Sequence, residues 1–89
     1  MFFIAFLSLT YANPHYESGI AQLTDKNYAQ AINNFKQCIQ IDPQNTDCHW
    51  EIGWAYWMLS DWENVVSHWT TVQRLKPDQE GVEQYLSQA

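Results

Sequence analysis

The clearest structural signal in this 89-residue chain lies in residues 43–77, which read PQNTDCHWEIGWAYWMLSDWENVVSHWTTVQRLKP. A proline stands at each end of the segment, and a proline disfavours helical backbone in the residue before it. Between the prolines, apolar residues recur at steps of three and four from about Thr46 to Leu59 and again over 62–75. This is the periodicity of α-helices. Asp61 precedes the second run as a suitable N-cap, so the segment predicts two consecutive helices.

The same plan occurs upstream at an offset of 34 residues. Asn13 as N-cap and Pro14 at the first helical position predict a helix to about Thr24, and a second helix follows the turn at 25–27. Six pairs of residues share the offset: Gly19 and Gly53, Tyr28 and Trp62, Ala31 and Val65, Phe35 and Trp69, Cys38 and Val72, and Pro43 and Pro77. A fixed period of this length indicates stacked helical repeats.

Each second helix carries one apolar stripe, and a last short helix is expected from about Asp78. The stripes comprise Tyr28, Ala31, Ile32, Phe35, Cys38 and Ile39, then Trp62, Val65, Val66, Trp69, Val72 and Leu75, and finally Val82, Tyr85 and Leu86. Gly19 and Gly53 lie inside helices, where glycine costs about 1 kcal/mol relative to alanine. Their matched positions predict close approach of the partner helix.

A helix-turn-helix unit of 34 residues with these offsets resembles the tetratricopeptide repeat. The second unit matches the family pattern at Ile52, Gly53, Tyr56, Trp62, Trp69 and Pro77. The first unit matches at Gly19, Tyr28, Ala31, Phe35 and Pro43, but Ser18 and Gln22 replace the large apolar and aromatic residues of the pattern. The resemblance implies an all-α solenoid of two units, 13–45 and 46–79, closed by a capping helix in 80–89.

The first twelve residues, MFFIAFLSLTYA, are apolar through Leu9 and resemble the end of a secretory signal. Thr10 and Ala12 supply small residues three and one before a cleavage site, although no basic residue precedes the apolar run. Export to the periplasm or the medium is therefore expected. The alternatives are a hydrophobic helix that packs on the domain and a cytoplasmic location. The stretch is much shorter than the roughly 20 apolar residues that span a membrane.

Charge and size exclude several classes of function. Four Lys and Arg stand against ten Asp and Glu, a net charge of −6, and the four basic residues are scattered among acids. No basic stripe exists to neutralise phosphates, so nucleic acid is not expected as a partner. A chain of this size leaves no room for two lobes around a cleft, and it has no glycine-rich phosphate loop or nucleophile motif. We expect no enzymatic activity, no cofactor and no small-molecule substrate.

The resemblance places a partner-binding surface on the first helix of each unit. The residues carried to that surface are Tyr16, Glu17, Ile20, Leu23, Asp47, Trp50, Glu51, Trp54, Trp57 and Met58. Trp50, Trp54 and Trp57 share one side of their helix, opposite the side that carries Ile52, Tyr56 and Leu59. A helix apolar on both sides must bury the second side against a peptide, another protein or a second copy of the chain. Alternatively, the N-terminal or the closing helix covers the tryptophans.

The acidic residues on this surface indicate the chemistry of the expected partner. Tetratricopeptide domains that hold a C-terminal carboxylate use Lys, Arg and Asn there, whereas this chain has Glu17, Asp47 and Glu51. An apolar or aromatic segment carrying Lys or Arg would suit such a surface, although the acids could equally form a solvated rim. The sequence thus predicts a protein-interaction module. The alternative is a self-assembling scaffold subunit, in which the surface takes the end of another copy.

The cysteines and histidines complete the candidates. Cys38 and Cys48 lie five residues before and after Pro43, so they face each other across two antiparallel helices. They could form a disulfide or remain as two buried thiols. His15, His49 and His68 show no spacing that would define a metal site, so no metal is expected.

Overall fold

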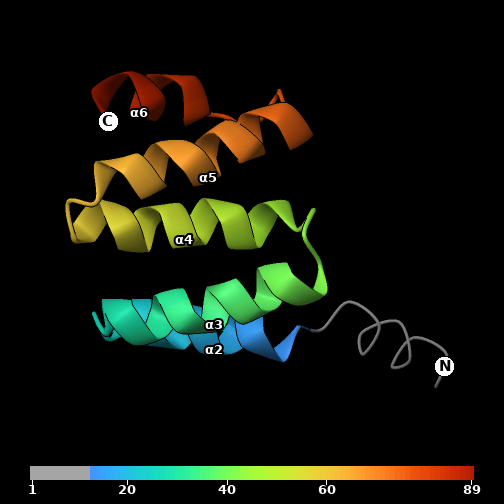
Figure 1. Ribbon diagram of the computed structural model, residues 1–89, viewed down its shortest axis with the longest axis vertical. Helices are drawn as coiled ribbons and strands as arrows, with labels where there is room; N and C mark the ends of the chain where they lie inside the picture. The colour runs from blue at the N-terminus through green and yellow to red at the C-terminus, as the bar shows by residue number, and fades with distance from the viewer. Residues whose placement is uncertain (1–12) are drawn as a thin grey trace, which may run out of the picture.

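The computed structural model describes residues 13–89, which form five α-helices (Figure 1). The N-terminal segment 1–12, for which a signal was predicted, lies outside the described residues. The helices are α2 (Pro14–Thr24), α3 (Tyr28–Ile41), α4 (Thr46–Met58), α5 (Trp62–Leu75) and α6 (Val82–Gln88). None of the helices within 13–89 has the length and apolarity needed to cross a bilayer.

The predicted helix starts are confirmed by their caps. Asn13 Oδ1 accepts hydrogen bonds from the backbone N–H of His15 at 3.0 Å and of Tyr16 at 3.2 Å. Asp61 likewise accepts from the backbone N–H of Asn64 at the start of α5. Such caps satisfy N–H groups that have no partner inside the helix. Helix α4 ends at Met58, one residue before the predicted end.

The helices pack as two antiparallel pairs, α2 with α3 and α4 with α5, and α3 lies against α4 (Figure 1). Helix α6 packs against α5 at the far end of the stack. The largest fully buried side chains are Trp69 and Phe35, one from the second helix of each pair. The observed architecture is the predicted all-α solenoid of two helix pairs with a closing helix.

Both helical glycines mark close helix contacts, as predicted. A Cβ on Gly19 would lie 2.5 Å from Phe35 Cε1, and a Cβ on Gly53 would overlap the indole of Trp69. Each glycine therefore lets the large aromatic side chain of the following helix lie against the helix backbone. Phe35 and Trp69 are fully buried as a result.

Two details of the sequence prediction are wrong. The closing helix begins at Val82, not near Asp78, because Gly81 takes a left-handed conformation with φ of 90° that a helix does not continue through. Leu59, Trp62 and Val66, assigned to core-facing sides, are 50%, 40% and 39% exposed. All three residues lie within or near the α4–α5 turn and keep this surface exposed.

Candidate interaction surface

Helix α4 has a buried side and an open side. Its buried residues are Cys48, His49, Ile52, Gly53, Ala55 and Tyr56. The remaining residues after Thr46 keep part or all of their surface accessible: Asp47, Trp50, Glu51, Trp54, Trp57 and Met58. These six, hereafter the open side of α4, are the α4 residues that the sequence assigned to a partner-binding surface.

The tryptophans of the open side belong to an aromatic cluster that comprises Trp50, Trp54, Trp57, Trp69 and Tyr85. Trp69 forms its base: its ring centroid lies 4.8 Å from that of Trp54, and its indole N–H donates to the Trp50 carbonyl at 3.0 Å. Tyr85 of α6 also packs on the cluster, with its ring 4.9 Å from that of Trp54 and 5.8 Å from that of Trp69.

The three tryptophans are therefore half-buried. The alternative that the closing helix covers the tryptophans holds in part: α6 packs on these rings through Tyr85, yet each tryptophan keeps accessible surface. Edge-to-face contacts, such as Trp50 with Trp54 at 5.6 Å and 82°, hold the rings in fixed orientations. The accessible faces are thus presented on a rigid support.

The acidic residues approach the first helix of the other pair, where α2 touches α4. Partial burial raises the pKa of the Tyr16 hydroxyl, and the charges of Glu51 and Asp47 raise it further, with a smaller effect from Glu17. Burial, followed by the charge of Asp47, also raises the pKa of Glu51. These effects show that Tyr16 and the three carboxylates share one region of negative potential.

The remaining residues that the sequence assigned to the partner-binding surface lie on α2 and at the end of α4. Ile20 and Leu23 lie one and two turns after Tyr16, and both are partly buried against the core. Met58, at the C-terminal end of α4, is 55% exposed. The structure thus combines an acidic region near Tyr16 with an apolar region that ends at Met58.

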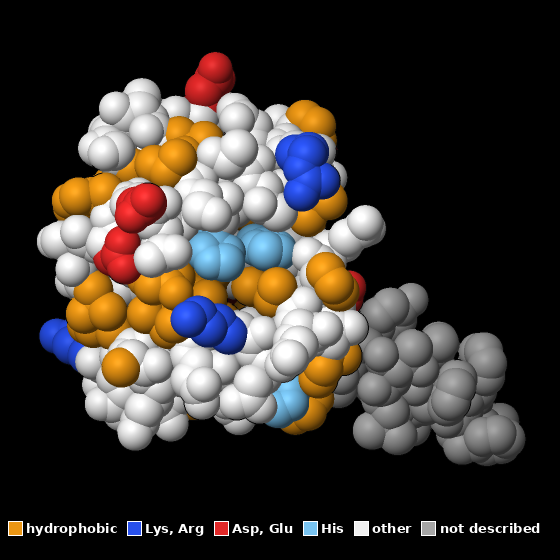
Figure 2. Space-filling view, viewed as in Figure 1, with side chains coloured by type: hydrophobic (Ala, Val, Ile, Leu, Met, Phe, Trp, Pro, Cys, Tyr) orange, Lys and Arg blue, Asp and Glu red, His pale blue; other side chains and the backbone are white. Residues whose placement is uncertain are grey.

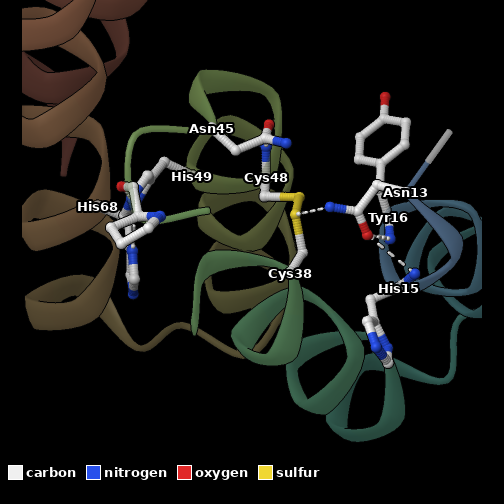
Figure 3. The surroundings of a disulfide bond; sticks show 9 residues. Asn13, His15, Tyr16, Cys38, Asn45, Cys48, His49 and His68 are labelled. Atoms are coloured by element: carbon white, nitrogen blue, oxygen red, sulfur yellow. Dashed lines mark hydrogen bonds between the residues drawn. A yellow bond between two sulfur atoms is a disulfide. The ribbon is translucent and has the colours of Figure 1, made fainter. Parts of the chain in front are cut away.

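The sulfurs of Cys38 and Cys48 are bonded, joining α3 to α4 (Figure 3). The Cα atoms are 6.5 Å apart and both residues are fully buried. The Asn13 side chain, which caps α2 through its oxygen, directs its Nδ2 group at Cys38 Sγ at 3.3 Å. Helices from both pairs therefore meet at this bond.

A pair of histidines, not singled out as a pair in the sequence, bridges α4 and α5. Nδ1 of His49 and Nδ1 of His68 are 3.0 Å apart, and the His68 ring stacks on Tyr56 at 5.7 Å and 13°. Figure 2 shows the two imidazoles side by side near the middle of one face. The residues lie almost symmetrically about the α4–α5 turn. The mirror argument that paired the cysteines about Pro43 would therefore have found them.

Comparison with known proteins agrees with this geometry. Residues 25–60, from the α2–α3 turn to the α4–α5 turn, match the sequence model of the TPR repeat. This match and the observed fold support the predicted resemblance to the tetratricopeptide repeat family. A TPR repeat-containing protein of Picosynechococcus sp. is 34% identical over an alignment of 58 residues, and the match covers 61% of this chain. Those residues cover only 15% of the relative's length.

Tetratricopeptide repeats are in general protein-interaction modules, and typically non-enzymatic ones. Tyr85 lies 34 residues after Glu51, so α6 occupies the place of the first helix of a third repeat. The contribution of Tyr85 to the aromatic cluster could thus have been inferred by extending the offset once more.

Proposed function

We propose that this chain binds a protein segment that carries apolar or aromatic side chains and a Lys or Arg. The observation that carries the proposal is the division of α4: the side chains left accessible are three half-buried tryptophans, Met58 and two acids. Tryptophan held in a packed surround is a frequent anchor of protein interfaces, because burying its remaining surface stabilises the complex at little entropic cost.

The charges favour a basic partner. Glu51 and Asp47 act on Tyr16, and the net charge of the chain is −6. A Lys or Arg placed there would lower the repulsion among the carboxylates and could contact an aromatic face. The apolar side chains of the same segment would lie on the tryptophans.

The proposal is tested by selecting peptides from a random library on the full chain and measuring their binding by calorimetry. Trp54→Ala should weaken binding by about 2 kcal/mol or more, roughly 30-fold. Glu51→Gln should weaken peptides that contain Lys or Arg and leave neutral ones unchanged. Val66→Ala and Glu63→Gln, both on α5, are the controls. Selected peptides that bind both pairs of variants equally would contradict the proposal.

Trp54 also packs on Trp69 and Tyr85, so its removal has a cost in stability. Helical circular dichroism of Trp54→Ala at the temperature of the binding assay separates lost binding from lost folding. If the variant is unfolded there, Met58→Ala replaces it, because Met58 is exposed and its truncation leaves no cavity in the core.

Self-association is the second candidate, and the apolar side chains around the α4–α5 turn favour it. Met58, Leu59, Trp62 and Val66 are all exposed. Apolar residues grouped on a surface in this way are typical of protein-interaction sites. Light scattering after size-exclusion chromatography distinguishes self-association from peptide binding. A molecular mass that stays monomeric over a wide concentration range would rule out self-association and leave peptide binding as the remaining candidate.

We also propose that the chain works in an oxidising compartment. The bonded cysteines support this, since disulfides persist outside the reducing cytosol. Mass spectrometry of the protein from its native host is the test. A mature chain that begins at Asn13 is the expected result, and a chain that retains Met1 would contradict export.

A further inference from the structure

We propose that His49 and His68 form a two-imidazole binding site for a divalent transition-metal ion, Cu(II) or Ni(II). The site lies between α4 and α5, away from the open side of α4, so it is separate from the proposed partner surface. Its basis is the convergence of two Nδ1 atoms at 3.0 Å (Figure 3).

The Pro43 carbonyl fixes the proton on His49. Nε2 of His49 lies 2.9 Å from the Pro43 oxygen. A carbonyl only accepts, so Nε2 carries the proton and Nδ1 of the neutral ring offers its lone pair. Histidines that ligate metals usually donate their other N–H to a carbonyl or carboxylate in this way, which fixes the ring. His49 is therefore already in the tautomer and orientation of a ligand.

His68 supplies the second nitrogen. In the metal-free pair its Nδ1–H donates to Nδ1 of His49. When an ion binds, this proton moves to Nε2 of the same ring through water, which reaches the partly exposed side chain. Both Nδ1 lone pairs then become available, and the total number of protons is unchanged. Stacking on Tyr56 holds the His68 ring beside His49.

The spacing selects the kind of ion. An ion about 2.0–2.1 Å from each nitrogen, with the nitrogens held at the observed 3.0 Å, would see them at an angle of about 94°. This is close to the right angle between neighbouring ligands of Cu(II) or Ni(II), and narrower than the tetrahedral angle of Zn(II). Imidazole also binds Cu(II) most tightly among the common divalent ions of this series.

Water would complete the coordination. No group of three or more His, Cys, Asp or Glu side chains in residues 13–89 is placed to hold a metal ion. Lys36 of α3 is close enough for its positive charge to act on His68, and that charge opposes a bound cation. The site should therefore bind more tightly when Lys36 is neutralised.

The test is titration of the full chain with Cu(II) alone, followed by calorimetry and electron paramagnetic resonance. We expect one ion per chain, with hyperfine coupling to two imidazole nitrogens. His68→Gln should weaken binding about tenfold or more and remove one coupling. Lys36→Gln should strengthen binding. His15→Gln is the matched control, since His15 lies on α2 outside the pair, and it should leave binding unchanged.

Circular dichroism of each variant confirms that the helices persist, and His49→Gln provides a second test of the pair. The proposal is overturned if His68→Gln binds Cu(II) as the wild type does. It is equally overturned if the bound ion couples to fewer than two imidazole nitrogens, or if His15→Gln abolishes binding.

Discussion

At the scale of single residues, Gly53 and Trp69 govern the packing within the second helix pair. The indole of Trp69 lies where a side chain at position 53 would project, and it donates to the Trp50 carbonyl at 3.0 Å. Trp69 thus belongs both to the core and to the aromatic cluster. The size of residue 53 is therefore more important here than its helix propensity.

We predict that Gly53→Ala destabilises the chain. In an ordinary helix interior the change would favour folding by about 1 kcal/mol. Here the added Cβ would overlap Trp69, so we expect a loss of about 1–3 kcal/mol from overpacking. Urea unfolding measures it. Ser67→Ala, on an exposed part of α5, should be neutral or slightly stabilising. A Gly53→Ala variant as stable as the wild type would contradict the packing described.

His68 gives a prediction of pH dependence. Burial, followed by electrostatic interaction with His49 and with Lys36, lowers the pKa of His68 to about 4. The unfolded chain, with an ordinary pKa of about 6.5, then binds more protons than the folded chain between these two values. Its neutral form therefore contributes stability that is complete above about pH 6.5 and is lost as the pH falls to about 4.

Because the ring is partly exposed, we expect this loss to be about 1–2 kcal/mol after solvent screening. Unfolding measured between these pH values in the wild type and in His68→Gln isolates the contribution, since Tyr56, His49 and Lys36 stay in place. The free energy of unfolding should depend less steeply on pH in His68→Gln than in the wild type, and His15→Gln should show the same dependence as the wild type. Equal slopes in wild type and His68→Gln would sink the prediction.

At the scale of helices, the bond between Cys38 and Cys48 ties the two helix pairs together. It closes a short loop, with the cysteines ten positions apart. We predict that reduction lowers the free energy of unfolding by about 2–3 kcal/mol. Chemical unfolding with and without reductant measures the loss. The double variant Cys38→Ala and Cys48→Ala should show no effect of reductant, and an oxidised chain no more stable than the reduced one would count against the role given to this bond.

The helices themselves were predictable, because their caps and periodicity are local properties of the sequence. Asn13 and Asp61 begin helices as expected. The exposure of Trp62 and Val66 was not predictable, since periodicity gives the direction of a stripe but not the extent of the neighbouring helix. Helix α6 runs back along α5 toward the α4–α5 turn (Figure 1), yet Trp62 and Val66 remain exposed beside it. Its late start at Val82 depends on the backbone of Gly81, which the helix pattern does not reveal.

At the scale of the whole molecule, the repeat places the candidate surface. The offset of 34 aligns α2, α4 and α6, which is why the residues selected from the sequence on α4 are its open side. The repeat does not predict contacts between residues at non-equivalent positions of the repeat units. The sequence symmetry could have indicated the His49–His68 pair and the position of Tyr85, but the actual contacts of these side chains depend on how neighbouring helices pack and are given only by the structure.

The charge of the molecule gives a prediction about association rates. With a net charge of −6 and three carboxylates near Tyr16, the chain should attract a basic segment from beyond contact distance. The screening length falls from about 10 Å at 0.1 M salt to about 3 Å at 1 M. Raising salt over this range should slow association with a selected Lys-containing peptide by about tenfold. Dissociation should change little, because it is governed by the contacts with the tryptophans.

Stopped-flow tryptophan fluorescence follows both rates, since the aromatic cluster reports on the bound peptide. Glu51→Gln and Asp47→Asn should each reduce the dependence of association on salt, whereas Glu63→Gln, which lies on α5, should reduce it less. If the overall charge alone steered association, the three variants would show the same dependence of the association rate on salt, because each removes one negative charge. A larger effect at positions 47 and 51 would locate the basic side chain of the partner beside Tyr16. An association rate that does not depend on salt would contradict electrostatic recognition and leave the tryptophans as the basis of binding.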